Sequence, residues 1–163
     1  MKLSKKLSEI INRQINSEFA SGYLYLAMAA YFESQNLAGF GSWMKKQAAE
    51  EQAHAMKFYS YLVERGAAVS LAAIEAPKAE WKSPLEAFQD VYAHELKVTG
   101  MIYQIVEAAQ AEKDHATVSF TKWFVDEQVE EEANASMIAE KLKLIGANTG
   151  GLFLLDRELG ARQ

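Results

Sequence analysis

The sequence contains no cysteine and very little proline. Of its 163 residues none is cysteine and only two are proline. The lack of cysteine excludes disulfide frameworks, thiolate zinc sites, iron–sulfur clusters and cysteine nucleophiles. Any bound metal would therefore need carboxylate, imidazole or amide ligands. The scarcity of proline, together with abundant alanine, leucine, glutamate, lysine and glutamine, favours a helical protein.

Long hydrophobic runs and an excess of positive charge are also absent. The longest uninterrupted apolar run, residues 23–32, has ten residues and is too short to cross a bilayer. The net charge is −5 and the pI is near 5.3, which does not suit nucleic acid or an anionic membrane. No signal-peptide cleavage site follows the basic residues at the start. We therefore expect a cytoplasmic protein that binds neither nucleic acid nor a membrane.

Apolar side chains recur with a 3.6-residue period along nearly the whole chain, which predicts helices. We expect four long helices, at about 4–33, 40–65, 83–111 and 114–145, and a short one at about 151–159. The third begins with a capping box formed by Ser83 and Glu86. The connection 66–82 is long enough to run the length of a helix. The pattern predicts an all-α single domain over residues 1–163, in which two helical hairpins are joined by a long crossover.

Polar residues interrupt the apolar face of each long helix near its middle. Buried carboxylates are rare unless they are paired or bind a metal. One such residue alone would be read as a core residue with its hydrogen bonds satisfied. Six residues share this placement: Glu18, Glu51, His54, Glu95, Gln128 and Glu131.

The spacing of these six residues repeats in the two halves of the chain. The separation between Glu18 and Glu51 along the sequence equals that between Glu95 and Gln128. One constant shift along the sequence relates the two sets: Glu18 to Glu95, Glu51 to Gln128, and His54 to Glu131. Two docked hairpins would gather the side chains into a ring of carboxylates with one imidazole, the ligand set of a di-iron or di-manganese centre in helical bundles. Such ligands suit Fe(II), Fe(III) and Mn(II).

The chain resembles the ferritin superfamily, and most of all the non-haem ferritins of bacteria and archaea. The residues that carry the resemblance are Glu18, Tyr25, the segment 50–54, Glu95, Trp123, the segment 127–131 and the terminal segment 151–159. The resemblance implies a ferritin-like four-helix bundle with a short fifth helix. It also implies iron storage and detoxification by a ferroxidase that uses O₂ or H₂O₂. The ferric mineral would lie inside a hollow shell of 24 subunits.

Two departures separate this chain from neighbouring families. The wider superfamily has Glu-x-x-His twice, whereas the second copy here is Gln128-x-x-Glu131. Bacterioferritins place a haem-ligating methionine after the bridging glutamate, whereas Gln52 follows Glu51 here. We therefore expect no haem. Rubrerythrins need cysteines, which this sequence lacks.

The resemblance also implies which residues hold the two irons of each subunit. One iron would bind Glu18, Glu51 and His54. The other would bind Glu51, Glu95 and Glu131, with Gln128 close by. Glu51 would bridge the two ions.

Other residues allow two interpretations. Tyr25 lies two helical turns after Glu18 and would either donate an electron or hydrogen-bond to a ligand carboxylate. Glu50, Glu127 and Glu130 match a third, weaker iron site of the family, but they are equally compatible with a solvated acidic face.

Several residues carry expectations about burial. We expect His94 and His115 at the surface, and Trp123 in the core or near the site. Tyr23, Tyr31 and Trp81 are read as exposed aromatic residues that hint at subunit interfaces. The short C-terminal helix should bury a stripe formed by Leu152, Phe153, Leu155 and Leu159. It would dock around a four-fold axis of the shell or onto its own bundle.

Two other functions remain open from the sequence. A di-iron oxidase or peroxidase acting on a small molecule would need an apolar substrate pocket at the site. A non-catalytic helical-bundle scaffold would need no metal, and the matched spacings of the two halves count against it.

Overall fold

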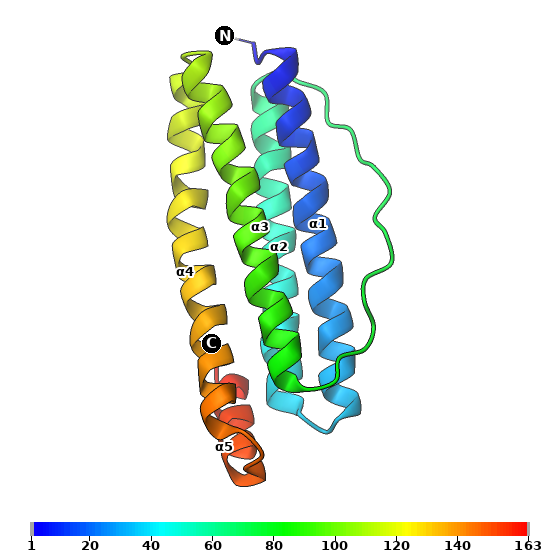
Figure 1. The fold of residues 1–163 in the computed structure, drawn as a ribbon. Helices are drawn as coiled ribbons and strands as arrows, with labels where there is room; N and C mark the ends of the chain where they lie inside the picture. Colours follow the sequence, from blue (N-terminus) through cyan, green and yellow to red (C-terminus); the bar gives the residue numbers. More distant parts are fainter. Residues whose placement is uncertain (1, 163) are drawn as a thin grey trace.

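The computed structural model describes residues 2–162, and its regular structure consists of five helices (Figure 1). They are α1 (Lys5–Ser34), α2 (Ala38–Glu64), α3 (Pro84–Ala111), α4 (His115–Ile145) and α5 (Thr149–Gly160). No strand occurs within residues 2–162. The all-α fold predicted from the periodicity is confirmed, and the helix bounds differ from the expected ones by only a few residues.

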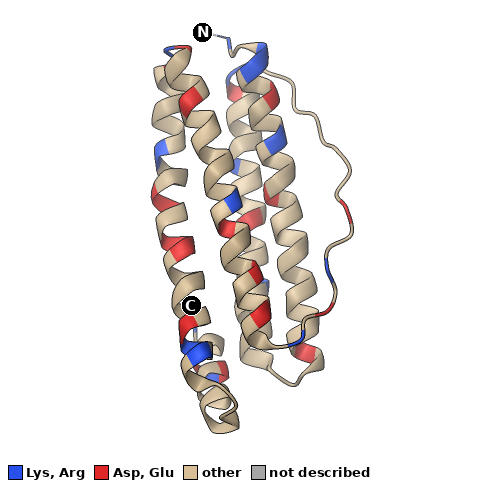
Figure 2. Ribbon diagram, in the orientation of Figure 1, with Lys and Arg blue, Asp and Glu red and all other residues tan. Residues whose placement is uncertain are grey.

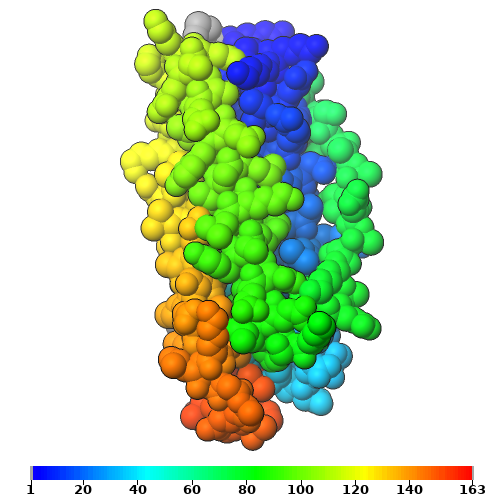
Figure 3. Space-filling model, viewed as in Figure 1, coloured from blue at the N-terminus to red at the C-terminus, as the bar shows by residue number. Residues whose placement is uncertain are grey.

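The four long helices form two antiparallel hairpins, α1 with α2 and α3 with α4 (Figure 1). Because α2 and α3 run in the same direction, the chain must travel back along the bundle between them. Residues 65–83 make this crossover along the outer side of α1, and the space-filling view shows them lying against it (Figure 3). The predicted long connection is confirmed.

Two asparagines of α1, one helical turn apart, hold the crossover in place. Asn12 donates from Nδ2 to the carbonyl of Ala68 at 3.0 Å and accepts from the backbone N–H of Ser70 at 2.6 Å. Asn16 accepts from the backbone N–H of Ala72 at 3.2 Å. These bonds satisfy backbone groups of an extended segment that has no sheet partner.

The helix starts follow local side-chain chemistry. Ser83 Oγ accepts from the backbone N–H of Glu86 at 3.1 Å, as the capping box predicts. The Glu86 carboxylate, however, accepts from the backbone N–H of Lys82, one residue before the expected one, at 2.6 Å. Asp114 caps α4 and also forms an ion pair with Arg65 at 2.6 Å, which ties the end of α2 to the start of α4.

The apolar core is divided into two clusters, one toward each end of the bundle. One cluster includes Phe32, Phe40 and Phe88, and the other includes Phe58 and Phe124. In every long helix the polar residues near the middle fall between the parts that contribute to the two clusters. The fold therefore places a buried polar layer between two apolar ones.

Helix α5 docks onto its own bundle, chiefly against the start of α2. Leu155 and Leu159 are buried, and Asp156 Oδ1 accepts from the backbone N–H of Phe40 at 2.9 Å. Gly39 permits this approach, because a Cβ built there would lie 1.7 Å from the Asp156 carbonyl oxygen. Phe153 of the predicted stripe is 61% exposed in the single chain, so docking on the bundle does not by itself bury it.

The reading of Trp81 as an exposed aromatic residue is also wrong. It is buried, its ring lies 5.4 Å from that of Tyr31, and its indole N–H donates to Asp90 at 2.8 Å. Trp81 belongs to the crossover itself and packs between Tyr31 of α1 and Asp90 of α3, contacts that helical periodicity cannot reveal. Tyr23 is exposed as expected. No helix within residues 2–162 combines the length and the apolar character that a membrane span requires.

Candidate metal centre

The six polar residues singled out by their spacing all lie in the buried middle layer. None of them is more than 5% exposed. Glu18 comes from α1, Glu51 and His54 from α2, Glu95 from α3, and Gln128 and Glu131 from α4. Each long helix therefore contributes at least one polar group to one level of the bundle.

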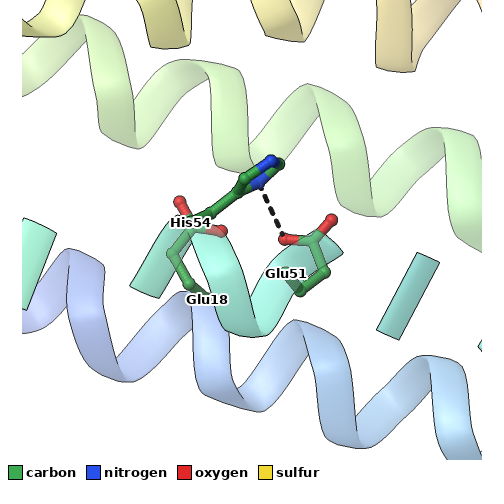
Figure 4. A group of neighbouring side chains, drawn as sticks. All are labelled: Glu18, Glu51 and His54. Carbon is green, nitrogen blue, oxygen red and sulfur yellow. Dashed lines mark ion pairs between the residues drawn. The ribbon is translucent and has the colours of Figure 1, made fainter. Parts of the chain in front are cut away.

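Three of these side chains converge closely. One ligand atom from each of Glu18, Glu51 and His54 lies within 4.8 Å of the others. Figure 4 shows these three side chains side by side. His54 Nδ1 lies 3.6 Å from Glu51 Oε2, because the two residues are three apart on one helix face. Among the residues that the structure describes, this is the one group of three histidine or acidic side chains close enough to hold a single ion.

Hydrogen bonds between the hairpins connect Glu95 and Glu131 of the second hairpin to side chains of the first. The Tyr25 hydroxyl donates to Glu95 Oε1 across the α1–α3 contact. Gln47 Nε2 donates to Glu131 Oε2 at 2.7 Å and to Glu51 Oε1 at 3.3 Å, so that one amide links carboxylates of both hairpins. Within the second hairpin, Gln128 Nε2 donates to Glu95 Oε2 at 3.1 Å.

Burial makes these carboxyl groups hard to ionise. Desolvation, and after it the neighbouring Glu51, raise the pKa of Glu18 well above its ordinary value. Desolvation raises the pKa of Glu51 to about 8 and that of Glu131 to about 7, and nearby Glu95 adds to both shifts. At neutral pH, burial and clustering favour the protonated form of such carboxyl groups. A bound cation favours the ionised form and replaces the protons.

The centre also contains buried oxygen atoms without a hydrogen-bond donor. Glu18 Oε2 and Gln14 Oε1 have no partner among the described residues. Unpartnered buried oxygens are costly. The Gln14 amide oxygen and the ionised form of the Glu18 carboxyl group are acceptors, which only a donor or a cation can satisfy. A carboxylate-rich set with one imidazole suits iron or manganese. The residues present therefore fit a cation bound by Glu18, Glu51 and His54.

Two glutamines that hydrogen-bond to the candidate ligands were not predicted from the sequence. Gln14 donates to Glu18 Oε1 at 2.8 Å, and Gln47 supports Glu51. Both glutamines lie four residues before the glutamate that they contact, on the same buried face. A polar residue on the buried face one turn before Glu18 and one turn before Glu51 was the signal that could have identified them.

The three residues of the suggested third site have different surroundings. Glu50 forms an ion pair with Arg162 at 2.6 Å. Glu127 lies with one carboxylate oxygen 4.0 Å from His54 Nε2. Glu130 is exposed. The three do not form a compact group of the kind made by Glu18, Glu51 and His54.

The expectation that His94 lies at the surface is wrong. Its ring is only partly exposed, its Nε2 lies 2.7 Å from Ser21 Oγ, and it meets the Tyr25 ring edge-on. Burial lowers the pKa of His94. His94 does lie on a different face of α3 from Glu95, but α1 packs against that face. His115 is exposed, as expected.

Trp123 packs beside the site rather than in the core. Its ring centroid lies 5.3 Å from that of His54, and its side chain is 39% exposed. The Lys57 Nζ lies 2.9 Å from its ring centroid. The tryptophan therefore covers the outer edge of the histidine.

Known proteins share both the sequence and the architecture. The ferritin-like domain family matches residues 8–145. The bacterial non-heme ferritin of Staphylococcus aureus (strain USA300) is 42% identical over 160 residues, which cover 98% of this chain and 96% of that protein. The bacterial non-heme ferritin of Staphylococcus haemolyticus is 44% identical with the same coverage.

Solved structures agree over the full length. The open pore ferritin of the hyperthermophilic archaeon Archaeoglobus fulgidus superposes with a TM-score of 0.98 at 53% identity, covering 99% of this chain and 100% of that one. A closed form of that ferritin, engineered by site-directed mutagenesis, gives a TM-score of 0.97 at 53% identity, with 99% of both chains covered. The chain belongs to the ferritin family, and the bacterial non-heme ferritins are among its relatives.

Proposed function

We propose that this protein stores iron by oxidising Fe(II) in the polar layer of the bundle and keeping the ferric product as a mineral inside a hollow shell. The observation that carries the proposal is the buried convergence of Glu18, Glu51 and His54, with one Glu18 oxygen left without a donor. Membership of the ferritin family supports the same function. Iron is here the substrate and the cargo, with two ions bound in each subunit and no haem.

The proposed ligands divide between the two hairpins. Glu18, Glu51 and His54 hold one ion, and Glu95 and Glu131 hold the other, with Glu51 shared and Gln128 nearby. Glu95 is kept in place by Tyr25 and Gln128, and Glu131 by Gln47. Carboxylates favour the higher charge of Fe(III), so this ligand set stabilises the product of oxidation.

Protons leave the site when the cations enter. With a pKa of about 8 for Glu51 and about 7 for Glu131, both groups hold protons for much of the time at neutral pH. Binding of Fe(II) requires the ionised carboxylates, so it releases these protons. Electron transfer to O₂ or H₂O₂ then completes the oxidation.

Assembly into a shell, of 24 subunits by the family resemblance, would cover apolar surface that the single chain exposes. Tyr23 and Leu26 of α1 are each about half exposed, and the exposed Ile74 of the crossover lines the same shallow pocket. Figure 2 shows that the upper part of the crossover carries no charge, whereas its lower part does. Such a surface suits contact with a second copy. With α5 docked on the bundle, we treat the whole chain as one domain.

Aerobic addition of Fe(II) to the purified, sized protein tests the proposal. We expect rapid oxidation and a ferric product that stays soluble and co-elutes with a large oligomer. Glu18→Gln should slow the oxidation strongly, whereas Glu107→Gln, which changes an exposed glutamate of α3, should not. Ferric precipitate at the rate of a protein-free control would contradict the proposal.

The same experiment separates the two alternative functions. A di-iron oxidase acting on a small molecule would bind two ions without accumulating mineral. A scaffold would bind no iron, and its stability would be unaffected when Glu18 and Glu51 are both made apolar.

We also propose that Glu50, Glu127 and Glu130 form a weaker transit site for iron that leaves the oxidising pair. Glu130→Ala should leave the first burst of oxidation, at two irons per subunit, almost unchanged. It should alter the later phase, in which the centre must clear before it turns over again. Stopped-flow oxidation at low and high iron loading measures both phases, and wild-type behaviour in both would support a solvated acidic face instead.

A further inference from the structure

The C-terminal segment after α5 reaches back to the polar layer through one side chain. Arg162 donates from Nη2 to Glu50 Oε2 at 2.6 Å and from Nη1 to Gln47 Oε1 at 3.0 Å. Its guanidinium carbon also lies 5.0 Å from the ring centroid of Trp43. One arginine thus contacts a proposed transit-site residue and the amide that links both halves of the centre.

The docking of α5 delivers this arginine. The Asp156 carboxylate caps the start of α2, and the close approach at Gly39 and Gly160 holds the last turn of α5 against it. Leu155 and Leu159 bury the inner face of α5. The position of Arg162 is therefore a consequence of how α5 packs.

We infer that Arg162 is a positioning residue for iron handling, which neutralises Glu50 when no metal is bound there and orients the amide of Gln47. The inference rests on the proposed function. It assigns to the C-terminal segment a role inside each subunit, in addition to any role in assembly.

The first part of this role is competition. A cation that binds Glu50 must displace the guanidinium from the same carboxylate, so Arg162 weakens cation binding at that residue. The side chains of Glu50 and Arg162 are 41% and 24% exposed, so water screens the pair and the effect is modest.

The second part is orientation. An amide presents N–H groups on one side and an oxygen on the other. Because Arg162 donates to the Gln47 oxygen, the Gln47 nitrogen must face Glu51 and Glu131. Without Arg162 the amide is free to turn, and the two carboxylates then lose a shared donor.

The two parts predict changes of opposite sign when the charge is removed. In Arg162→Met, which keeps an apolar stem over Trp43, binding that involves Glu50 should become about two- to fivefold tighter. Binding at the buried pair should become weaker by about as much. If the substitution only loosened the packing of the C-terminal segment, cation binding at Glu50 and at the buried pair would both become weaker.

Calorimetric titration with Zn(II) under anaerobic conditions measures two binding steps, one at the buried pair and one that involves Glu50. Zn(II) has no redox chemistry, so no oxidation accompanies binding. The step that disappears in Glu50→Gln identifies the binding that involves Glu50. Arg162→Lys keeps the charge and should restore the wild-type affinity of that step. Arg157→Met removes an exposed arginine of the same helix and should change neither step. Size-exclusion chromatography checks that the oligomer is unchanged.

The outcomes distinguish this inference from the proposed function. If the wild-type pair binds no Zn(II), the proposed function fails. If the pair binds normally but no step depends on Glu50, or if Arg162→Met leaves that step unchanged or weakens both steps, the role of Arg162 is overturned. Where Arg162→Met does not assemble, Arg162→Gln, which also lacks the charge, must give the same tightening.

Discussion

The two halves of the polar layer have polar residues at matching positions but support them in different ways. In the first half Glu18 and Glu51 each accept a hydrogen bond from a glutamine one turn earlier in their own helix, Gln14 and Gln47. In the second half the residues at the corresponding positions, Val91 and Phe124, are buried and apolar. The repeat between the two halves therefore includes the six polar residues but not the glutamines that hydrogen-bond to Glu18 and Glu51.

The second half takes much of its support from the first. Glu95 accepts from Tyr25 of α1, and Glu131 accepts from Gln47 of α2. The first half is thus supported within a single hairpin, whereas the second combines its own bond from Gln128 to Glu95 with donors from the first hairpin. The two hairpins do not contribute equivalent sites, and mutations should affect them unequally.

The largest effect should come from Glu51, the residue that both proposed ions share. Glu51→Ala should lower the initial rate of Fe(II) oxidation by at least about a hundredfold, since removing even an outer partner of a metal ligand can cost that much. The fold should persist, because the change relieves clustered carboxyl groups. Stopped-flow absorbance measures the rate and circular dichroism checks the fold. An undiminished rate would refute the sharing of Glu51.

The next largest effect should distinguish the two glutamines. Gln47→Met should weaken Zn(II) binding at the pair by about tenfold or more, because it removes a donor from both halves. Gln14→Met removes a donor from Glu18 alone and should cost only about two- to threefold. Equal losses in the two variants would mean that Gln47 does not link the halves.

A smaller effect is expected at Tyr25, whose hydroxyl supports the second half. Tyr25→Phe should slow Fe(II) oxidation about three- to tenfold, because Glu95 loses a buried donor. Zn(II) binding by Glu18, Glu51 and His54 should be unchanged. The exposed Tyr103 provides the control, Tyr103→Phe.

The same variant decides between the two roles of Tyr25. A transient tyrosyl radical seen by electron paramagnetic resonance in the wild type, and absent in Tyr25→Phe, would assign electron donation. Slower oxidation without any radical in the wild type would assign the hydrogen bond alone. A wild-type rate in Tyr25→Phe would exclude both roles.

The smallest effect concerns the pH dependence of stability without metal. The pKa of Glu51 is about 8 in the folded protein against an ordinary value of 4.5, and that of Glu131 is about 7. Below pH 4.5 both states keep these protons. Between there and about pH 8 the unfolded chain releases protons that the folded protein retains, so stability falls as the pH rises.

In a chelating buffer the melting temperature should therefore fall as the pH rises from 5.5 to 8.5. Glu51→Gln should flatten this drop, because the variant has no proton to lose at that position. Glu107→Gln should keep the wild-type slope. Identical slopes in the two variants would show that Glu51 is not the group responsible.

Much of the architecture was readable from the chain alone. A helix repeats every 3.6 residues, so local order decides which face is apolar and which polar residues fall on it. That is why the helices, the long crossover and the burial of Glu18, Glu51 and His54 could be predicted. The matched spacings of the two halves then placed the six polar residues at one level, since each hairpin must align its own helices.

Only the tertiary structure decided how these residues meet. Tyr25 donates to Glu95, Gln47 joins Glu51 to Glu131, and Arg162 reaches Glu50 from the far end of the chain. Periodicity defines the face of a single helix, but it carries no information about the neighbouring helix that covers that face. The same limit explains His94, which α1 covers, and Trp81 of the crossover, which packs against α1 and α3. Contacts between distant segments depend on rotation, depth and side-chain conformation at each packed surface, and these are determined only when the whole chain has folded.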